Sequence, residues 1–279
     1  MMKKSLLVIC LVVSLAAGAQ PLHVMTFNIR FDNAADSLDA WPYRKDKVAS
    51  QVLFHNTHIV GVQEALHHQL TELLELLPSY RFTGVGRDDG KRAGEFSAIL
   101  YDTARLRMLH TETSWLSETP SVPGSKSWDA AITRVVTWAR FEDLESHRTL
   151  YVFNTHFDHI GRVARKQSAA MLLKMITDVA GTEPVIVTGD FNCFPGDEPI
   201  RVLTSGEGSL KDSRTITEQP HYGPEGTFNG FSGKELADQP IDYIFLKNGG
   251  RVTQHATLSQ TWRGRFSSDH FPVYAVISY

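Results

Sequence analysis

A carboxylate and an amide follow one of the most apolar segments of the chain. Residues 184–189 read Pro-Val-Ile-Val-Thr-Gly, a β-type run, and Asp190 and Asn192 come directly after it with one residue between them. A buried strand has no packing use for such groups, because charged and polar side chains are costly to bury without a partner. The spacing therefore predicts a functional site at the end of this strand.

Five further apolar runs meet polar side chains at one end. Those side chains belong to Asn28, Glu64, His156, Asp242 and the adjacent pair Asp269 and His270. Polar groups gathered at strand ends indicate one assembled site rather than scattered surface residues. Because neighbouring residues of a regular strand face opposite sides, Asp269 and His270 can share a site only if they lie on the loop before the last strand.

The oxygen-bearing members of this set favour a hard divalent cation. The carboxylates of Glu64, Asp190 and Asp269, with the amide oxygens of Asn28 and Asn192, suit Mg²⁺ or Mn²⁺ better than zinc. The Cys and His spacing of a zinc site is missing from the sequence.

Many strands and few helices must position these residues. Segments rich in Val, Ile, Phe and Tyr predict strands at 22–29, 58–64, 80–86, 96–101, 134–142, 149–157, 184–190, 241–246, 252–258 and 271–278. Helical spacing of apolar residues predicts helices at 44–54, 70–77 and 164–179. Because several strands follow one another without a helix, we expect two mainly antiparallel sheets packed face to face, with helices outside. Segments 111–131 and 203–233 are predicted to be long surface loops.

The first 19 residues have the composition of a secretory leader. Lys3 and Lys4 precede an apolar stretch, and Ala17-Gly18-Ala19 offers a cleavage site before Gln20. The apolar stretch is shorter than the roughly 20 residues of a membrane-spanning helix. We therefore expect a signal peptide at 1–19, one domain at 20–279, no membrane span in the mature chain, and a periplasmic or secreted protein.

Composition limits the partners of the mature chain. The full chain has 28 basic and 31 acidic side chains, so loss of Lys3 and Lys4 leaves 26 against 31, a formal charge of −5. A protein built to grip long nucleic acid is usually basic. Cleavage would also leave Cys193 as the only cysteine, which excludes an intrachain disulfide. We expect a buried Cys193 and a monomer stabilised by its core.

The ordered motifs resemble those of the endonuclease/exonuclease/phosphatase superfamily, which includes DNase I. The matching segments are Asn28, Gln63-Glu64, Asn154-Thr-His156, Gly189-Asp-Phe-Asn192, Asp242-Tyr and Ser268-Asp-His270. Each motif alone is weak, but six in the right order span nearly all of the mature chain. Trp41-Pro-Tyr-Arg44 and Gly94-Glu95-Phe further resemble the branch that holds deadenylase-like and many uncharacterised secreted bacterial proteins.

The resemblance implies a four-layered α/β sandwich that hydrolyses a phosphoester by in-line attack of water. It assigns the metal to Glu64, supported by Asp269 and Asn28 directly or through water. Asp190 would orient or deprotonate the water, and Asn192 would hold a phosphate oxygen. His270, oriented by Asp242, and His156 would act on the phosphate itself. The resemblance allows one metal ion or two; Ile29-Arg30 stands where some nucleases carry an acidic residue, which disfavours the second site.

Several other residues have both a functional and a structural interpretation. Glu95, Arg263 and Arg265 are candidate substrate contacts, the last two because they lie just before Asp269. Arg44 is expected to form an ion pair on its helix. Three tryptophans in loop-like segments could stack on a base or ring, or pack these segments onto the domain; these are Trp115, Trp128 and Trp262.

Two enzyme classes and one binding module come into question for the whole chain. A secreted metal-dependent phosphoesterase is the leading hypothesis, acting on a phosphorylated small molecule or a short nucleic acid. A calcineurin-like phosphoesterase would need an early Asp-x-His motif, and Met25-Thr-Phe-Asn28 does not supply it. The alternative is a non-catalytic phosphate- or metal-binding domain of the same fold, because fold alone does not fix function.

Overall fold

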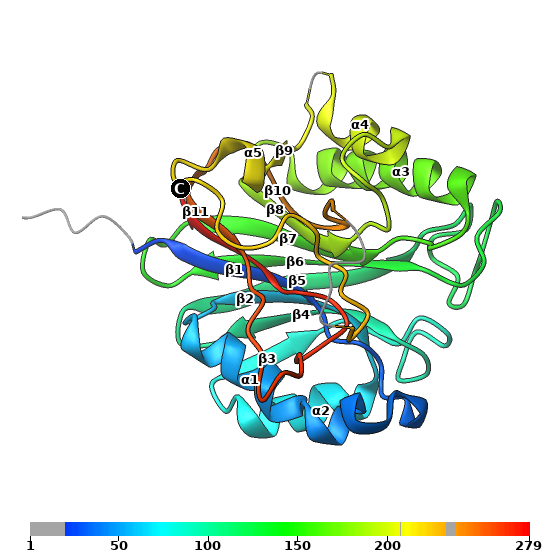
Figure 1. Cartoon of the computed structure of the whole chain (residues 1–279). Helices are drawn as coiled ribbons and strands as arrows, with labels where there is room; N and C mark the ends of the chain where they lie inside the picture. The colour runs from blue at the N-terminus through cyan, green and yellow to red at the C-terminus, as the bar shows by residue number, and fades with distance from the viewer. Residues whose placement is uncertain (1–19, 207, 233–237) are drawn as a thin grey trace, which may run out of the picture.

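Two six-stranded sheets pack face to face in the computed structural model, which describes residues 20–206, 208–232 and 238–279 (Figure 1). The first sheet has the order β11 (Arg251–Thr257), β12 (Val273–Ser278), β1 (Leu22–Asn28), β2 (Ile59–Ala65), β4 (Phe96–Asp102) and β3 (Tyr80–Thr83). The second has the order β5 (Leu106–Trp115), β6 (Val135–Asp143), β7 (Thr149–His156), β8 (Val185–Asp190), β10 (Asp242–Lys247) and β9 (Lys211–Asp212).

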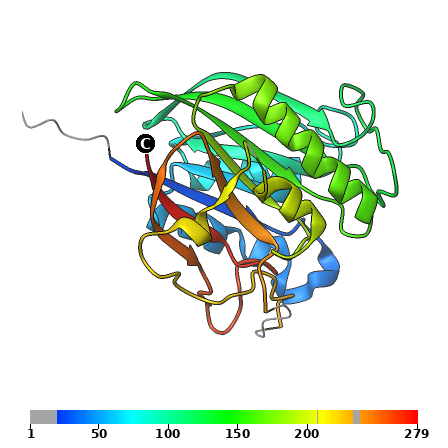
Figure 2. The same ribbon diagram turned by 90° about the horizontal axis from the view of Figure 1, so that it is seen from above.

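Helices cover the outer face of each sheet, which makes four layers (Figures 1 and 2). Helices α1 (Lys45–Phe54) and α2 (His67–Leu76) lie on the first sheet, and α3 (Arg162–Ala180) and α4 (Glu198–Thr204) lie on the second. Three short helices occupy connections: η1 (Ala34–Asp39), η2 (Trp41–Tyr43) and α5 (Ser213–Ile216). The predicted four-layered α/β sandwich is confirmed. The signal peptide expected at 1–19 lies outside the described residues, within which no helix is long and apolar enough to cross a membrane.

Alternate residues of the central strands feed three separate apolar layers. In β1, Val24 lies in the cluster between the two sheets, whereas its neighbour Met25 packs in the cluster beneath α1 and α2. In β8, Ile186 joins the layer between the sheets and Val187 joins the layer beneath α3. Because successive side chains face opposite sides of a sheet, burial on both faces explains why these strands read as continuous apolar runs.

A buried polar bridge joins the two sheets between β2 and β7. The Asn154 side chain accepts a hydrogen bond from Gln63 Nε2 at 2.7 Å and from Thr188 Oγ1 at 3.0 Å, and it donates to the Val62 carbonyl at 2.8 Å. Gly61 permits this close approach, since a Cβ there would lie 2.0 Å from Thr188 Oγ1. Two motif residues of the sequence therefore cross-link the sandwich instead of facing solvent.

The sequence-based prediction was wrong for part of each expected loop. Strand β5 occupies residues 106–115, so the segment 111–115 is extended and not a loop. Strand β9 and helix α5 lie within the expected loop 203–233. The strand β5 was missed because it is an edge strand: most of its side chains are exposed or half-buried, and its pairing with β6 shifts register between Met108 and His110.

Strand direction brings the chemical groups to one end of the sandwich. All neighbouring strands are antiparallel except β1 with β2 and β7 with β8. The parallel pairs place Asn28 beside Gln63 and His156 beside Asp190, each at a carboxyl end. Antiparallel β10 begins at Asp242 directly opposite Asp190. His270 precedes the first residue of β12, so the expectation that it lies on the loop is confirmed.

Candidate active site

Asp190 lies at the centre of the assembled groups. Its buried Oδ2 accepts a hydrogen bond from Asn28 Nδ2 at 3.0 Å, and it lies 3.3 Å from His156 Nε2 and 3.8 Å from His270 Nε2. Its Oδ1 accepts the backbone N–H of Asn192 at 3.0 Å. Burial, reinforced by the charge of Asp242, raises the pKa of Asp190. The carboxyl group is therefore suited to exchange a proton near neutral pH.

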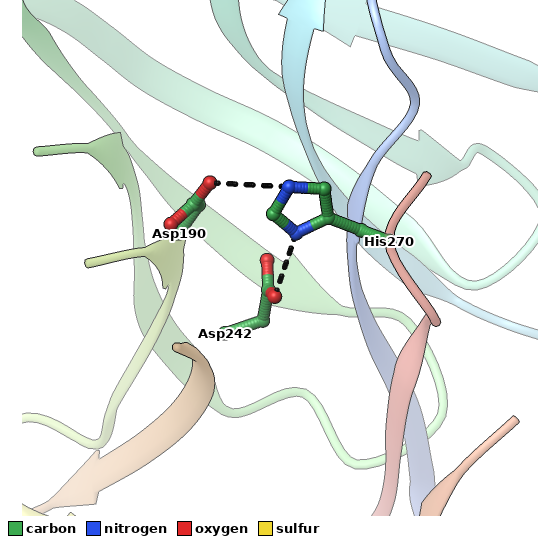
Figure 3. Close-up of side chains that lie close together, drawn as sticks. All are labelled: Asp190, Asp242 and His270. Carbon is green, nitrogen blue, oxygen red and sulfur yellow. Dashed lines mark hydrogen bonds and ion pairs between the residues drawn. The ribbon is translucent and has the colours of Figure 1, made fainter. Parts of the chain in front are cut away.

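His270 and Asp242 form a buried pair beside Asp190 (Figure 3). His270 Nδ1 lies 2.9 Å from Asp242 Oδ2, which also accepts the Thr227 hydroxyl at 2.6 Å. Burial alone would lower the pKa of His270, but the carboxylates of Asp242 and Asp190 raise it well above its usual range. His270 is therefore a cation that is oriented by one carboxylate and directed at the other.

His156 has the opposite charge state. Burial, together with the positive charges of Arg134 and Arg87, lowers the pKa of His156 well below its usual range. The Asn192 amide nitrogen lies 3.1 Å from His156 Nε2 and donates to the Phe157 carbonyl at 3.0 Å. A neutral imidazole and a cationic one thus face the same carboxylate.

Glu64 and Asp269 form an acidic group next to this centre. Asn28 Nδ2 donates to Glu64 Oε1 at 3.1 Å, and the side-chain Oδ1 of Asn28 accepts the backbone N–H of Arg30. The Arg30 guanidinium lies 3.9 Å from Glu64 Oε2 and 3.7 Å from Asp269 Oδ2. Burial and the charge of Glu64 raise the pKa of Asp269. Since its nitrogen faces the carboxylates, Asn28 orients these groups, and its role as a metal ligand stays a prediction.

Unusual backbone conformations aim three of these side chains. Arg30, Glu64 and Asn192 have φ values of 56°, 60° and 48°, in the left-handed region that residues other than glycine seldom adopt. Glu64 lies where β2 loses register with β4, between Val62 and Ala65. Strained residues of this kind persist where the surrounding structure holds them and are common at functional sites.

The groups open into a cleft of about 380 Å³. Its wall combines acidic, basic and apolar side chains: Arg30, Phe31, Glu64, Glu95, Ile132, Arg134, His156, His159, Asp190, Asn192, Phe228, Ile241, Asp269 and His270. The volume is in the range of sites for small ligands, a few hundred Å³. A small phosphorylated molecule fits such a space.

The structure brings most of the predicted site residues together and separates two. Eight form one group with Asp190 at its centre, as described: Asn28, Glu64, His156, Asp190, Asn192, Asp242, Asp269 and His270. Glu95 lines the cleft, where both of its oxygens accept from Arg87 at 2.6 and 2.8 Å. Arg263 is exposed and Arg265 pairs with Asp39 at 3.0 Å; neither lines the cleft. A turn and an ion pair hold both side chains away from the cleft, so a role as substrate contacts stays a prediction without support from the cleft geometry.

Two structural expectations resolve in opposite ways. Cys193 is buried, as predicted, and burial raises the pKa of its thiol to about 12. In the part of the chain that the structure describes, Arg44 forms no ion pair, contrary to the expectation. Its guanidinium donates to backbone carbonyls, among them Asp39 at 2.8 Å and Arg30 at 2.7 Å. Arg44 therefore ties the segment after β1 to α1.

Of the two roles expected for the tryptophans, packing is observed for Trp115. Trp115 is buried and its indole N–H donates to the Arg87 carbonyl at 2.6 Å. Trp128 and Trp262 are half-buried, and neither lines the cleft.

Sequence reasoning missed Arg134, Arg30 and Thr227. Arg134 and Arg30 line the cleft, and Thr227 hydrogen-bonds Asp242 from outside it. Arg30 could have been found, because it follows Asn28 by two residues. Nothing in the sequence around Arg134 or Thr227 distinguishes them from ordinary residues before a strand or in a turn.

Two groups of side chains could hold a divalent cation. Asp190, Asp242 and His270 offer ligand atoms that all lie within 4.8 Å of one another (Figure 3). Glu64 and Asp269 offer oxygens that converge on Arg30. Buried carboxylates with too few cationic partners fit Mg²⁺ or Mn²⁺ in charge and donor type.

Comparison with known proteins agrees with this geometry. A solved endonuclease/exonuclease/phosphatase of Bacteroides vulgatus superimposes with a TM-score of 0.88 at 37% identity and covers 92% of this chain and 98% of its own. A mannosyl-6-phosphatase of Bacteroides thetaiotaomicron VPI-5482 gives 0.87 at 36% identity, with 92% and 100% covered. The human Nocturnin catalytic domain gives 0.72 at 20% identity, with 93% of each chain covered, a likeness of fold alone.

Curated relatives lie further away in sequence. Protein angel of Drosophila melanogaster is 23% identical over 272 residues, which cover 86% of this chain and 72% of the relative. The sequence model of the Endonuclease/Exonuclease/phosphatase family matches residues 25–270, which include every group around Asp190. The protein therefore belongs to the endonuclease/exonuclease/phosphatase family.

Proposed function

We propose that the protein is a metal-dependent phosphoesterase that hydrolyses a small phosphorylated substrate with a water molecule activated by Asp190. The observation that carries the proposal is the position of Asp190: buried at the base of the cleft, it faces the neutral His156, the cationic His270 and the amide of Asn28. A carboxylate that orients water, surrounded by fixed donors, is what in-line attack on a phosphoester requires.

Glu64 and Asp269 are the residues proposed to hold the metal ion. We favour Glu64 and Asp269 over the group of Asp190, Asp242 and His270. In that group the His270 cation, hydrogen-bonded to Asp242, already offsets the charge of the carboxylates. Bound there, Mg²⁺ or Mn²⁺ would supply positive charge for a phosphoryl oxygen and lower the pKa of bound water. Arg30 would limit the negative charge around the ion, since it lies close to both carboxylates.

The other residues of the site have roles that follow from their contacts. His270 can donate from Nε2 toward charge that develops near Asp190, because Asp242 fixes its Nδ1. Asn192 positions His156 through its amide nitrogen, and its contact with a phosphate oxygen remains part of the proposal.

A small substrate is favoured over long nucleic acid. The cleft of about 380 Å³ and the acidic composition both argue for it. The mannosyl-6-phosphatase neighbour, whose name states a phosphorylated sugar as substrate, supports the same class. The leader-like residues 1–19 support a periplasmic or secreted location. The competing function is a non-catalytic binding domain, and only turnover separates the two.

Hydrolysis by purified residues 20–279 tests the proposal. The panel contains p-nitrophenyl phosphate, bis-p-nitrophenyl phosphate, sugar phosphates and short single-stranded DNA and RNA, each with Mg²⁺ or Mn²⁺ and with EDTA. Asp190→Asn should lower kcat by at least about 1000-fold, roughly the 4 kcal/mol of a lost catalytic group. Asp178→Asn, which alters an exposed carboxylate of α3, is the matched control. Turnover in Asp190→Asn equal to that of the control would refute the role of Asp190, and metal binding without turnover of any ester would support the binding domain.

A further inference from the structure

Arg134 is a buried cation in the wall of the cleft that lacks an anionic partner. It directly precedes β6 and is 6% exposed. Its Nε and Nη1 atoms have no hydrogen-bond partner, and its Nη2 lies 3.4 Å from His159 Nδ1. Within residues 20–206, 208–232 and 238–279, no carboxylate lies within ion-pair distance of this guanidinium.

Two other buried arginines show what the fold normally provides. Arg105 pairs with both oxygens of Asp143, at 2.6 and 3.1 Å, and Arg44 donates to several backbone carbonyls. A buried charge without such partners is costly, because it has lost water and gained nothing in return. Burial accordingly lowers the pKa of Arg134. An unpaired guanidinium in a cleft wall is thus explained by a ligand better than by packing.

The surrounding contacts keep Arg134 in place and keep its charge available. Asp158 Oδ2 accepts the backbone N–H groups of Ala131 and Ile132 at 2.9 and 3.1 Å, which fixes the segment before Arg134. The backbone carbonyl of Arg134 accepts the backbone N–H of Leu116 at 2.8 Å. Glu95 lies in the same wall and is bound through both oxygens to Arg87; it attracts Arg134 only from beyond ion-pair distance.

We propose that Arg134 binds the terminal phosphate of a phosphomonoester and thereby makes the enzyme prefer monoesters to diesters. This inference rests on the proposed phosphoesterase function. A monoester carries close to two negative charges above its second pKa of about 6 and presents three strong acceptor oxygens. A diester carries one charge and places a second ester group where the third oxygen would be.

The position of Arg134 agrees with this assignment. Arg134 lines the same cleft as His156 and Asp190, and Val136, two residues further on, pairs with Thr155, the neighbour of His156. The acidic group of Glu64 and Asp269 is balanced by Arg30 and the proposed metal ion. Arg134 is therefore the additional positive charge that a second negative charge on the substrate needs, and its planar donors suit phosphate oxygens.

Parallel kinetics on two esters test the inference. The metal-loaded wild type, Arg134→Met, Arg134→Lys and the control Arg107→Met are assayed on p-nitrophenyl phosphate and bis-p-nitrophenyl phosphate. Arg107 is an exposed arginine at the opposite end of the same sheet. We expect Arg134→Met to lower kcat/KM for the monoester by about 100-fold, the effect of a charge-assisted contact of about 3 kcal/mol. The diester should change less than about threefold, and Arg134→Lys should retain part of the preference.

Stability and phosphate binding provide readouts independent of turnover. Because Arg134 is unpaired, Arg134→Met should keep or raise the melting temperature, and inorganic phosphate should bind the metal-loaded variant at least tenfold more weakly in calorimetry. Equal losses on both esters, or unchanged phosphate binding, would overturn the inference. If the wild type hydrolyses no ester of the full panel, the proposed function fails, whereas phosphate binding that depends on Arg134 would still support an anion site.

Discussion

Thr227 holds Asp242 in place without touching the cleft. Its hydroxyl donates to Asp242 Oδ2 at 2.6 Å and accepts the backbone N–H groups of Ile241 and Asp242 at 3.1 and 3.2 Å. The side chain is fully buried. Replacing it by valine keeps the shape and removes all three contacts. We predict that Thr227→Val folds, loses stability and lowers kcat while KM stays unchanged.

The expected size of the effect follows from the contacts. A hydrogen bond to a charged group contributes about 1.5–3 kcal/mol, and a buried N–H left without its acceptor adds to the loss. The free energy of unfolding should therefore fall by about 2–4 kcal/mol, which a domain stable by about 5–15 kcal/mol can survive. If the lost orientation of Asp242 is felt fully in the transition state, kcat falls by about 10–100-fold.

Thr227→Ser is the matched control, because it keeps the hydroxyl and removes one methyl group, a loss of about 1 kcal/mol. Urea denaturation gives the stability of both variants, and steady-state kinetics on whichever ester the wild type hydrolyses gives kcat and KM. The reasoning is refuted if Thr227→Val is no less stable than Thr227→Ser, or if its KM rises while kcat is retained.

Two further predictions concern the metal and the response to acid. Glu64→Gln should weaken Mn²⁺ binding, measured by calorimetry, at least about tenfold. The control is Glu72→Gln on α2, whose carboxylate pairs with Lys45 and which should leave Mn²⁺ binding unchanged. Equal Mn²⁺ affinities of the two variants would exclude Glu64 as a ligand. Burial, with the nearby His221 and Arg214, lowers the pKa of His255 to about 3. As the pH falls below about 6.5, His255 therefore binds a proton in the unfolded chain but not in the folded one. The free energy of unfolding of the wild type should fall by about 2 kcal/mol between pH 7.5 and pH 5, a loss that His255→Gln avoids. Identical acid sensitivity of the two proteins in urea denaturation would contradict this.

The regular part of the fold was predictable because both faces of each sheet are buried. Strands such as β1 and β8 read as unbroken apolar runs, and a polar residue at the end of such a run has few reasons to be there other than function. The positions of Asn28, Glu64, Asp190 and His270 followed from this contrast, and the parallel pairing of β1 with β2 and β7 with β8 brings them together. Half-exposed β5 lacked the contrast, so it was missed.

The rest of the site depends on contacts that sequence proximity does not report. Arg265 is close to Asp269 in the chain, yet Asp39 binds it away from the cleft. Arg134 is remote from every motif, and β6 brings it beside His156, which ends the neighbouring strand β7. The left-handed backbone of Glu64 could not be predicted either, because tertiary pairing imposes it against the residue's own preference.

Several strained residues and unpaired polar atoms lie at the cleft or directly beside it. Arg30, Glu64 and Asn192 adopt left-handed backbone conformations, and His156 Nδ1 and Asp242 Oδ1 are buried without hydrogen-bond partners, as are two nitrogens of Arg134. Each such feature lowers stability by roughly 1–3 kcal/mol, so it persists only because the apolar layers and the Asn154 bridge hold the surrounding strands. Substitutions that relieve these features should stabilise the fold and weaken the chemistry, whereas substitutions that break the Asn154 bridge should destabilise the fold. At these positions of the cleft, local preference yields to function.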